Sequence, residues 1–139
     1  TRNYCEYFTL KSFTEKWNKG RDKVSAHKAA GYTRIGPAIR HASSLLEKQN
    51  TIHKWIILLS DGKPNDYDKY EGIHGIEDVK KALQESENKG IFTHALAIDK
   101  RAKYYLPQMF GFGAYEILPK VANLPYSLSN FFSKIMLKG

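Results

Sequence analysis

The sequence lacks most features that mark secreted, membrane-bound or well-known catalytic proteins. Cys5 is its single cysteine, so no disulfide forms within the 139-residue chain. No apolar run approaches the about 20 residues that a membrane-spanning helix needs, and no signal peptide is visible. Phosphate-binding glycine loops, the G-x-S-x-G nucleophile motif and the H-E-x-x-H zinc motif are all missing. These absences favour a protein of the reducing cytoplasm that is not an enzyme and does not insert into a membrane.

The formal charge of +8 is unevenly distributed along the chain. Residues 1–50 contain ten basic and four acidic side chains and residues 101–139 contain five and one, whereas residues 51–100 contain seven and nine. The lysines are dispersed and are not interleaved with aromatic residues, so the basic excess does not indicate a nucleic-acid partner. The length and the 42% of hydrophobic residues predict a single domain over residues 1–139. Because residue 1 is a threonine and a strand is predicted almost directly after it, we expect a piece of a longer protein.

Hydrophobic periodicity predicts strands and helices in alternation. The predicted strands cover residues 3–10, 55–59, 91–98 and 115–118. Predicted helices begin at Ser12, cover residues 37–48, 76–88 and 102–106, and fill the C-terminal end after Pro125. The expected buried positions on two of these helices are Ile39, Ala42, Leu45 and Leu46, and then Leu128, Phe131, Phe132, Ile135 and Met136. Such alternation predicts an α/β fold of Rossmann-like type, with a largely parallel sheet flanked by helices.

The centre of this pattern is the apolar run at residues 55–59, which predicts a strand buried on both faces. Asp61 follows at the strand's carboxyl end, the edge at which open α/β sheets bind ligands. Thr33 precedes it by 28 positions, which hold one helix and one strand, so both residues can lie at the same edge. A hydroxyl and a carboxylate together suit a hard divalent cation such as Mg²⁺. The alternative is that Asp61 belongs only to a turn and that Thr33 only caps a helix.

An acidic loop follows Asp61 and contains Asn65, Asp66, Tyr70 and Glu71. It does not fit an EF-hand, because the position that requires glycine is occupied by Glu71 when the count starts at Asp66. The loop is either a solvated segment that packs its tyrosines on the sheet edge or a surface for a partner. A different hypothesis is an Mg²⁺-dependent hydrolase or phosphotransferase that uses Asp61, Asp66 and Asp99 at the strand ends.

Several stretches together resemble one known family. They are Tyr32-Thr33-Arg34-Ile35-Gly36, the string DGKPNDYDKYEG that starts at Asp61, Gly75-Ile76-Glu77-Asp78, Ala97-Ile98-Asp99 and Tyr105-Leu106-Pro107. In these residues the chain resembles the von Willebrand factor A (vWA) domain of the NorD/CbbO family, over about residues 9–137. The resemblance implies a vWA domain that lacks its first strands in this chain, with residues 4–10 as the antiparallel edge strand. Exposed strand edges would then favour self-association.

The resemblance also implies a metal-ion-dependent adhesion site, which the family builds from an Asp-x-Ser-x-Ser motif, a threonine and an aspartate. Thr33 and Asp61 match the last two, but the chain contains no Asp-x-Ser-x-Ser. We therefore expect weak or absent cation binding here unless another segment supplies the missing ligands.

The family's function implies an adaptor that works with a MoxR-type AAA+ ATPase to activate or assemble a metalloenzyme, such as nitric oxide reductase or Rubisco. The partner would bind through the metal site and the surrounding residues, which are Arg34, Asn65, Asp66, Tyr70 and Glu71.

Overall fold

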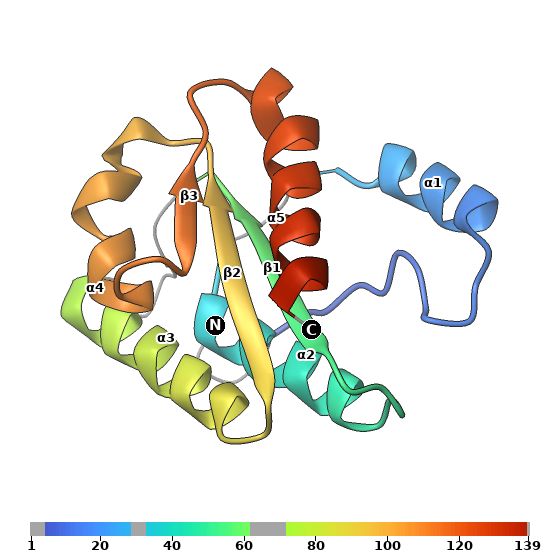
Figure 1. Ribbon diagram of the computed structural model, residues 1–139, viewed down its shortest axis with the longest axis horizontal. Coiled ribbons are helices and arrows are strands. Elements are labelled where there is room, and N and C mark those ends of the chain that lie inside the picture. Colours follow the sequence, from blue (N-terminus) through green and yellow to red (C-terminus); the bar gives the residue numbers. More distant parts are fainter. Residues whose placement is uncertain (1–4, 29–32, 62–71, 139) are drawn as a thin grey trace.

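The computed structural model describes residues 5–28, 33–61 and 72–138 (Figure 1). Its helices are α1 (Trp17–Ala26), α2 (Ile35–Glu47), α3 (Gly72–Glu87), α4 (Leu106–Phe110) and α5 (Leu124–Lys138). Its strands are β1 (Lys54–Ser60), β2 (Ile91–Ala97) and β3 (Tyr115–Ile117), and short 3-10 helices cover Lys100–Tyr104 and Val121–Asn123. None of the helices in the described ranges has the length and apolar character needed to cross a bilayer.

The three strands form one parallel sheet in the order β1-β2-β3. β1 and β2 pair along their whole length, with Lys54 opposite Ile91 and Ser60 opposite Ala97. β3 pairs only with the last three residues of β2, where Ala95 lies opposite Tyr115. The carboxyl ends of all three strands therefore meet at one edge, as expected for a Rossmann-like α/β sheet.

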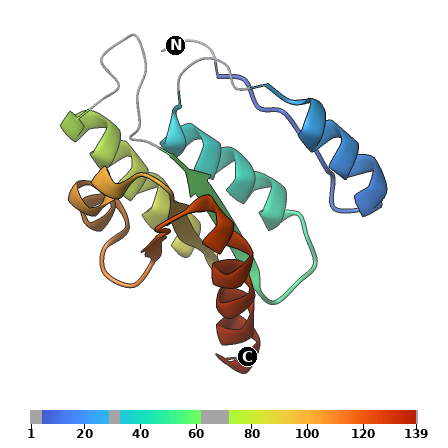
Figure 2. The same ribbon diagram turned by 90° about the horizontal axis from the view of Figure 1, so that it is seen from above.

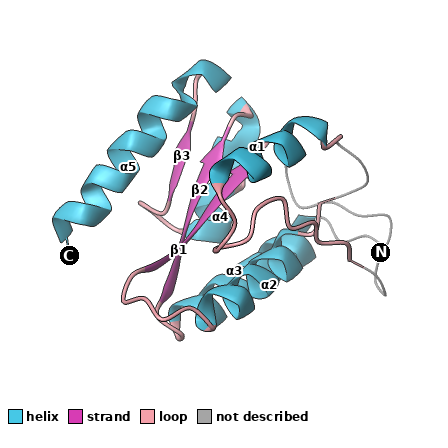
Figure 3. Cartoon of the chain, turned by 90° about the vertical axis from the view of Figure 1, so that its right-hand side faces the viewer, coloured by secondary structure: helices cyan, strands magenta, loops and turns pink. Residues whose placement is uncertain are grey.

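Helices cover both faces of this sheet (Figure 3). Helices α2 and α3 lie on one face and α5 lies on the other. Because side chains alternate along a strand, Leu58 and Ala95 join the core cluster on the α2–α3 side, together with Ile39 and Val79. On the opposite side Phe131 of α5 stacks on His94 of β2, with ring centroids 4.3 Å apart. The predicted fold class is thus confirmed.

Polar contacts join α2 to α3 beside the apolar core. The Arg40 guanidinium donates to Asp78 through Nη1 at 2.7 Å and to Glu85 through Nε at 2.6 Å. One turn further along α2, the buried hydroxyls of Ser43 and Ser86 form a hydrogen bond. These contacts fix how the two helices are aligned along each other.

The predicted first strand is wrong over the residues that can be compared. Residues 5–9 have no regular secondary structure, and residues 3 and 4 lie outside the described ranges. The aromatic and β-branched residues there favour an extended chain, but a strand also needs a neighbour to complete its hydrogen bonds. No strand of the described chain pairs with this segment, and the proposed edge strand is therefore absent.

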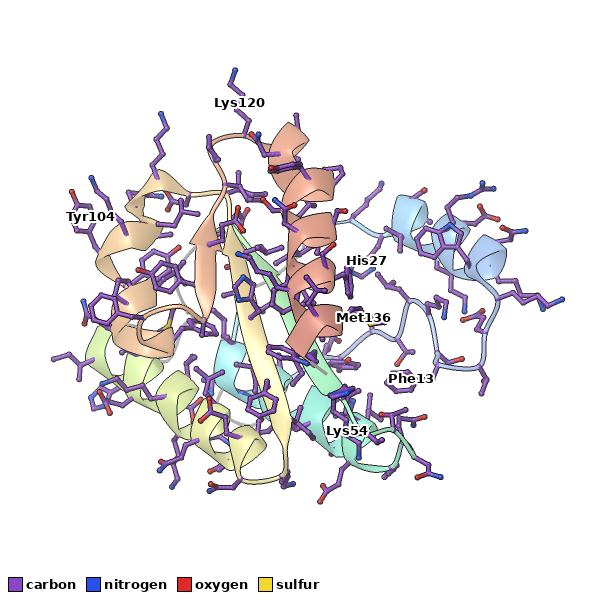
Figure 4. The ribbon with its side chains drawn as sticks, viewed as in Figure 1. Phe13, His27, Lys54, Tyr104, Lys120 and Met136 are labelled. Carbon is purple, nitrogen blue, oxygen red and sulfur yellow. The ribbon has the colours of Figure 1, made fainter. Side chains whose placement is uncertain are left out.

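The predicted helix at Ser12 begins later and is longer than expected. Ser12 and Glu15 form the expected turn, in which the Ser12 N–H donates to the Glu15 carboxylate at 3.3 Å. The regular helix α1 then runs over Trp17–Ala26. This N-terminal segment lies to one side of the rest of the chain (Figure 2), and Phe13 lies on it outside the sheet and its covering helices (Figure 4).

Some predicted burial patterns also differ from the structure. Leu59 of β1 is 53% exposed, and β1 is an outer strand of the described sheet. Phe132 and Met136 of α5 are exposed, since Phe131 points to the sheet and they lie on other sides of the helix. Pro107 was expected after the end of a helix, but it stands in the first turn of α4, where its missing N–H is tolerated.

Candidate metal and partner site at the carboxyl edge

Asp61 stands where the sequence places it, directly after the last residue of β1. The end of that strand is held to β2 by a hydrogen bond from the Ile98 N–H to the Ser60 carbonyl, at 3.1 Å. Asp61 itself is exposed, so its carboxylate faces solvent at the carboxyl edge. A carboxylate in this position can bind a cation without first being removed from the core.

Thr33 lies two residues before α2 and is also exposed. The far end of α2 lies at the amino edge of the sheet, because Lys89, just before β2, pairs with Glu47 at 2.9 Å. The beginning of α2 therefore lies at the opposite, carboxyl edge. The structure thus places Thr33 and Asp61 at the same edge, as the chain order predicts.

Asp99 is the second acidic residue at this edge, but its carboxylate is already engaged. It accepts from the Arg101 backbone N–H at 2.9 Å and from Arg101 Nε at 3.0 Å. Asp99 is the N-cap of the 3-10 helix Lys100–Tyr104, which explains this geometry. The Asp99 carboxylate thus has a structural role. It gives no support to the hypothesis of an enzyme that uses Asp61, Asp66 and Asp99 as a catalytic set. Asp66 lies outside the described residues.

Tyr105 adds a feature that the sequence analysis did not assign a role. Its side chain is 3% exposed, it belongs to the core cluster that contains Ile35 at the start of α2, and its hydroxyl has no hydrogen-bond partner among the described residues. Burial raises the pKa of Tyr105, and the charges of Asp99 and Asp61 raise it further against the opposing effect of Arg101. Both carboxylates therefore act on a single buried phenol beneath the carboxyl edge.

These observations fit a hard cation in part. The Thr33 hydroxyl and the Asp61 carboxylate are oxygen donors of the type that Mg²⁺ prefers, and both are accessible. Within the described ranges, no group of three or more His, Cys, Asp or Glu side chains could hold a metal. Thr33 and Asp61 would thus need water or other ligands to complete a coordination shell.

Of the predicted partner-binding residues, the structure describes Arg34. It is the N-cap residue of α2, is half-buried, and its carbonyl accepts from the Ala38 N–H at 3.3 Å. The remaining four predicted residues, Asn65, Asp66, Tyr70 and Glu71, lie outside the described residues.

Comparison with known proteins defines the class of the chain. The sequence profile of the von Willebrand factor type A domain matches residues 2–131. The chain therefore belongs to the von Willebrand factor type A domain family, whose members mediate protein interactions.

Two relatives make the similarity more specific. The chain is 39% identical to Protein NorD of Brucella melitensis over 139 residues, which cover 99% of this chain and 22% of that protein. It is 41% identical to Protein NorD of Stutzerimonas stutzeri over 110 residues, which cover 78% of this chain and 18% of that protein. The chain thus spans about a fifth of the length of these relatives. No solved structure matches at a comparable level of significance.

Proposed function

We propose that the chain is a protein-interaction module of a NorD/CbbO-like adaptor, with the carboxyl edge of its sheet as the binding surface. The single observation that carries this proposal is the position of Asp61, exposed at the end of β1 at the same edge as Thr33, in a chain of the vWA family. Similarity to proteins named NorD supports the choice of adaptor.

The proposed chemistry is a shared cation. Thr33 and Asp61 hold one side of a divalent ion, Mg²⁺ or a similar cation, and a carboxylate of the partner takes an open coordination position. Each oxygen donor alone binds such an ion weakly, so capture of the partner depends on the metal and on Asp61 together.

The proposed partner is a MoxR-type AAA+ ATPase, and the proposed outcome is activation or assembly of a metalloenzyme such as nitric oxide reductase. Arg34 and the loop residues Asn65, Asp66, Tyr70 and Glu71 would contact the partner around the ion. The proposed location is the cytoplasm, where such an ATPase works.

A pull-down tests this function. The chain is immobilised and exposed to a MoxR-type ATPase in Mg²⁺ and then in a chelator, with Asp61→Ala and Asp22→Ala as variants. Asp22 is an exposed aspartate on α1, so its substitution removes the same charge away from the edge. We expect capture to be weak, because the chain lacks Asp-x-Ser-x-Ser, but to require both Mg²⁺ and Asp61. It should persist with Asp22→Ala and be lost in the chelator or with Asp61→Ala. Capture that depends on neither metal nor Asp61 would refute the proposal.

A further inference from the structure

The edge of β2 that faces β3 is paired along only half of its length. β3 pairs with β2 from Ala95 onward, so the first half of β2 has no strand beside it on that side among the described residues (Figure 1). This unpaired stretch lies toward the amino edge of the sheet, at the opposite end from Asp61. It is therefore separate from the proposed metal site.

The backbone groups of Thr93 point into that gap. In a parallel sheet the N–H and C=O of one residue point to the same side, and neighbouring residues point to opposite sides. The Ala95 N–H donates to the Ala114 carbonyl at 3.0 Å, and the Leu118 N–H donates to the Ala97 carbonyl at 2.7 Å, so the odd-numbered residues of β2 point toward β3. Thr93 shares this direction but lies before the region that β3 covers.

The side chain of Thr93 is also unsatisfied. The residue is 7% exposed, and its hydroxyl is buried with no hydrogen-bond partner among the described residues. Buried polar groups in folded proteins are nearly always paired. Thr93 therefore combines a buried hydroxyl that has no described partner with a backbone N–H and C=O that no described strand pairs.

Two cavities flank this position, one on each face of the sheet. The first has a volume of about 610 Å³ and aromatic walls that include Trp55, Phe92 and Phe131. The second has a volume of about 510 Å³ and includes Leu83, Met109 and Phe110 of the α3–α4 side. Glu87, Thr93 and Ala114 border both cavities. Both volumes are in the range of ligand pockets, which is about 300–1,000 Å³.

An extended peptide matches this arrangement. Successive side chains of a strand point to opposite faces, so a strand placed beside Thr93 puts one side chain into each cavity. Gly113 borders the aromatic cavity with φ +90, and nothing lies within 4 Å of the position where its Cβ would be, so the cavity is open there. Main-chain hydrogen bonds then give affinity and the two cavities give specificity.

Charge at the shared border favours a basic peptide. Four charged residues border the cavities, and two of them have partners: Lys80 pairs with Glu77 at 2.6 Å, and Glu116 accepts from Ser127 at 2.6 Å. Lys134 borders only the aromatic cavity, whereas Glu87 borders both and forms no ion pair with a described residue. Glu87 can therefore pair with a lysine or arginine next to the inserted side chains.

We infer that the free edge of β2 at Thr93 binds an extended segment of a partner protein by strand addition. The segment carries an aromatic residue for the α5-side cavity, an adjacent aliphatic residue for the α3–α4 cavity, and a basic residue close by. This surface is distinct from the carboxyl edge, so the chain would hold a partner at both ends of its sheet.

A labelled, end-blocked peptide Lys-Thr-Phe-Val-Thr-Lys is the probe, and its binding is measured by fluorescence anisotropy. The same peptide N-methylated at Phe and Val keeps its side chains but loses two donors, and we expect its binding to weaken about ten-fold or more. The backbone N–H of Thr93 points away from β1, so Thr93→Pro removes this donor without breaking a hydrogen bond between β1 and β2. We expect it to weaken binding of the probe to a similar extent. Asp61→Ala should leave binding of the probe unchanged.

Leu59→Pro is the matched control. The Ser60 carbonyl faces β2, and neighbouring residues of a strand direct their backbone groups to opposite sides. The backbone N–H of Leu59 therefore faces the other edge of β1, which no described strand pairs. This variant should bind the probe as the unmodified chain does. Hydrogen exchange on the unmodified chain gives a second test that holds even if a proline variant does not fold: the probe should slow exchange of the Thr93 amide. Absence of probe binding, equal binding of the N-methylated probe, loss only with Leu59→Pro, or an unprotected Thr93 amide would each overturn the inference.

Discussion

The hydroxyl of Ser43 on α2 donates a hydrogen bond to the hydroxyl of Ser86 on α3, within the buried contact between the two helices. The direction follows from the second bond of Ser86, whose hydroxyl donates to the Ala82 carbonyl at 2.9 Å. Ser86→Ala should therefore leave the Ser43 donor unpaired and lower the free energy of unfolding by about 1–3 kcal/mol.

Ser43→Ala leaves the Ser86 donor bound to Ala82, so it should lower the free energy of unfolding by less than about 1 kcal/mol. Urea unfolding of the two variants measures the difference. The opposite order, with Ser43→Ala the more destabilising, would show that the bond runs the other way.

Arg40 should stabilise the same helix pair through its two carboxylates. Its side chain is 33% exposed, as against 27% for Asp78 and 40% for Glu85, so water screens the contacts only in part. Arg40→Met keeps most of the apolar stem and should lower the free energy of unfolding by about 1 kcal/mol. Lys80→Met is the control, since the Lys80–Glu77 pair is exposed and lies within α3. Equal effects of the two substitutions in thermal unfolding would argue against a special role for Arg40.

His94 should make stability depend on pH. Burial against Phe131 lowers the pKa of His94, Lys134 adds to this effect, and Glu116 opposes it. The unfolded chain, with a histidine pKa of about 6.5, takes up a proton before the folded chain does. The free energy of unfolding should therefore fall as the pH drops below about 6.5, until the folded pKa is passed.

His94→Gln should flatten this pH dependence, whereas His74→Gln, at an exposed histidine of α3, should preserve it. Urea unfolding between pH 7.5 and 5.5 compares the variants. Parallel profiles for His94→Gln and the unmodified chain would contradict the role of His94.

Tyr105→Phe should not destabilise the metal-free chain. The substitution removes a buried hydroxyl for which the described part of the chain offers no partner, and it keeps the ring in the core, so the free energy of unfolding should stay the same or rise by up to about 1 kcal/mol. Tyr104→Phe, at an exposed tyrosine, is the control and should have no effect. A loss of stability well beyond 1 kcal/mol would show that the Tyr105 hydroxyl has a structural partner.

The sequence was sufficient for the parts of the fold that local patterns determine. The apolar runs at β1 and β2 and the periodic stripe of α3 predict those elements to within a few residues, and the chain order places Thr33 and Asp61 at one edge. The segment at residues 5–9 could not be predicted, because its strand propensity says nothing about whether a neighbouring strand exists. Burial of Phe131 but not of Phe132 depends on how α5 is rotated on the sheet, which periodicity alone leaves open.

The sequence could not predict the two buried hydroxyls that lack a partner among the described residues, for a related reason. Thr93 lies in an apolar run and looks like an ordinary strand residue. Its exceptional position results from the short length of β3, which leaves half of β2 without a neighbour. Tyr105 follows Asp99 by six residues, but only the packing of the chain shows that its hydroxyl is buried and that the charges of Asp99 and Asp61 raise its pKa.

Paramagnetic NMR with Mn²⁺ is the most direct test of the carboxyl edge as a cation site, because it detects weak binding and reports where the ion lies. We expect low concentrations of Mn²⁺ to broaden the amide signals of Thr33 and Asp61 first, excess Mg²⁺ to reverse this broadening, and Asp61→Asn to abolish it. Asp22→Asn, which removes a carboxylate from α1, should leave the broadening unchanged. Broadening centred elsewhere, or the same broadening in Asp61→Asn, would contradict the proposed cation site.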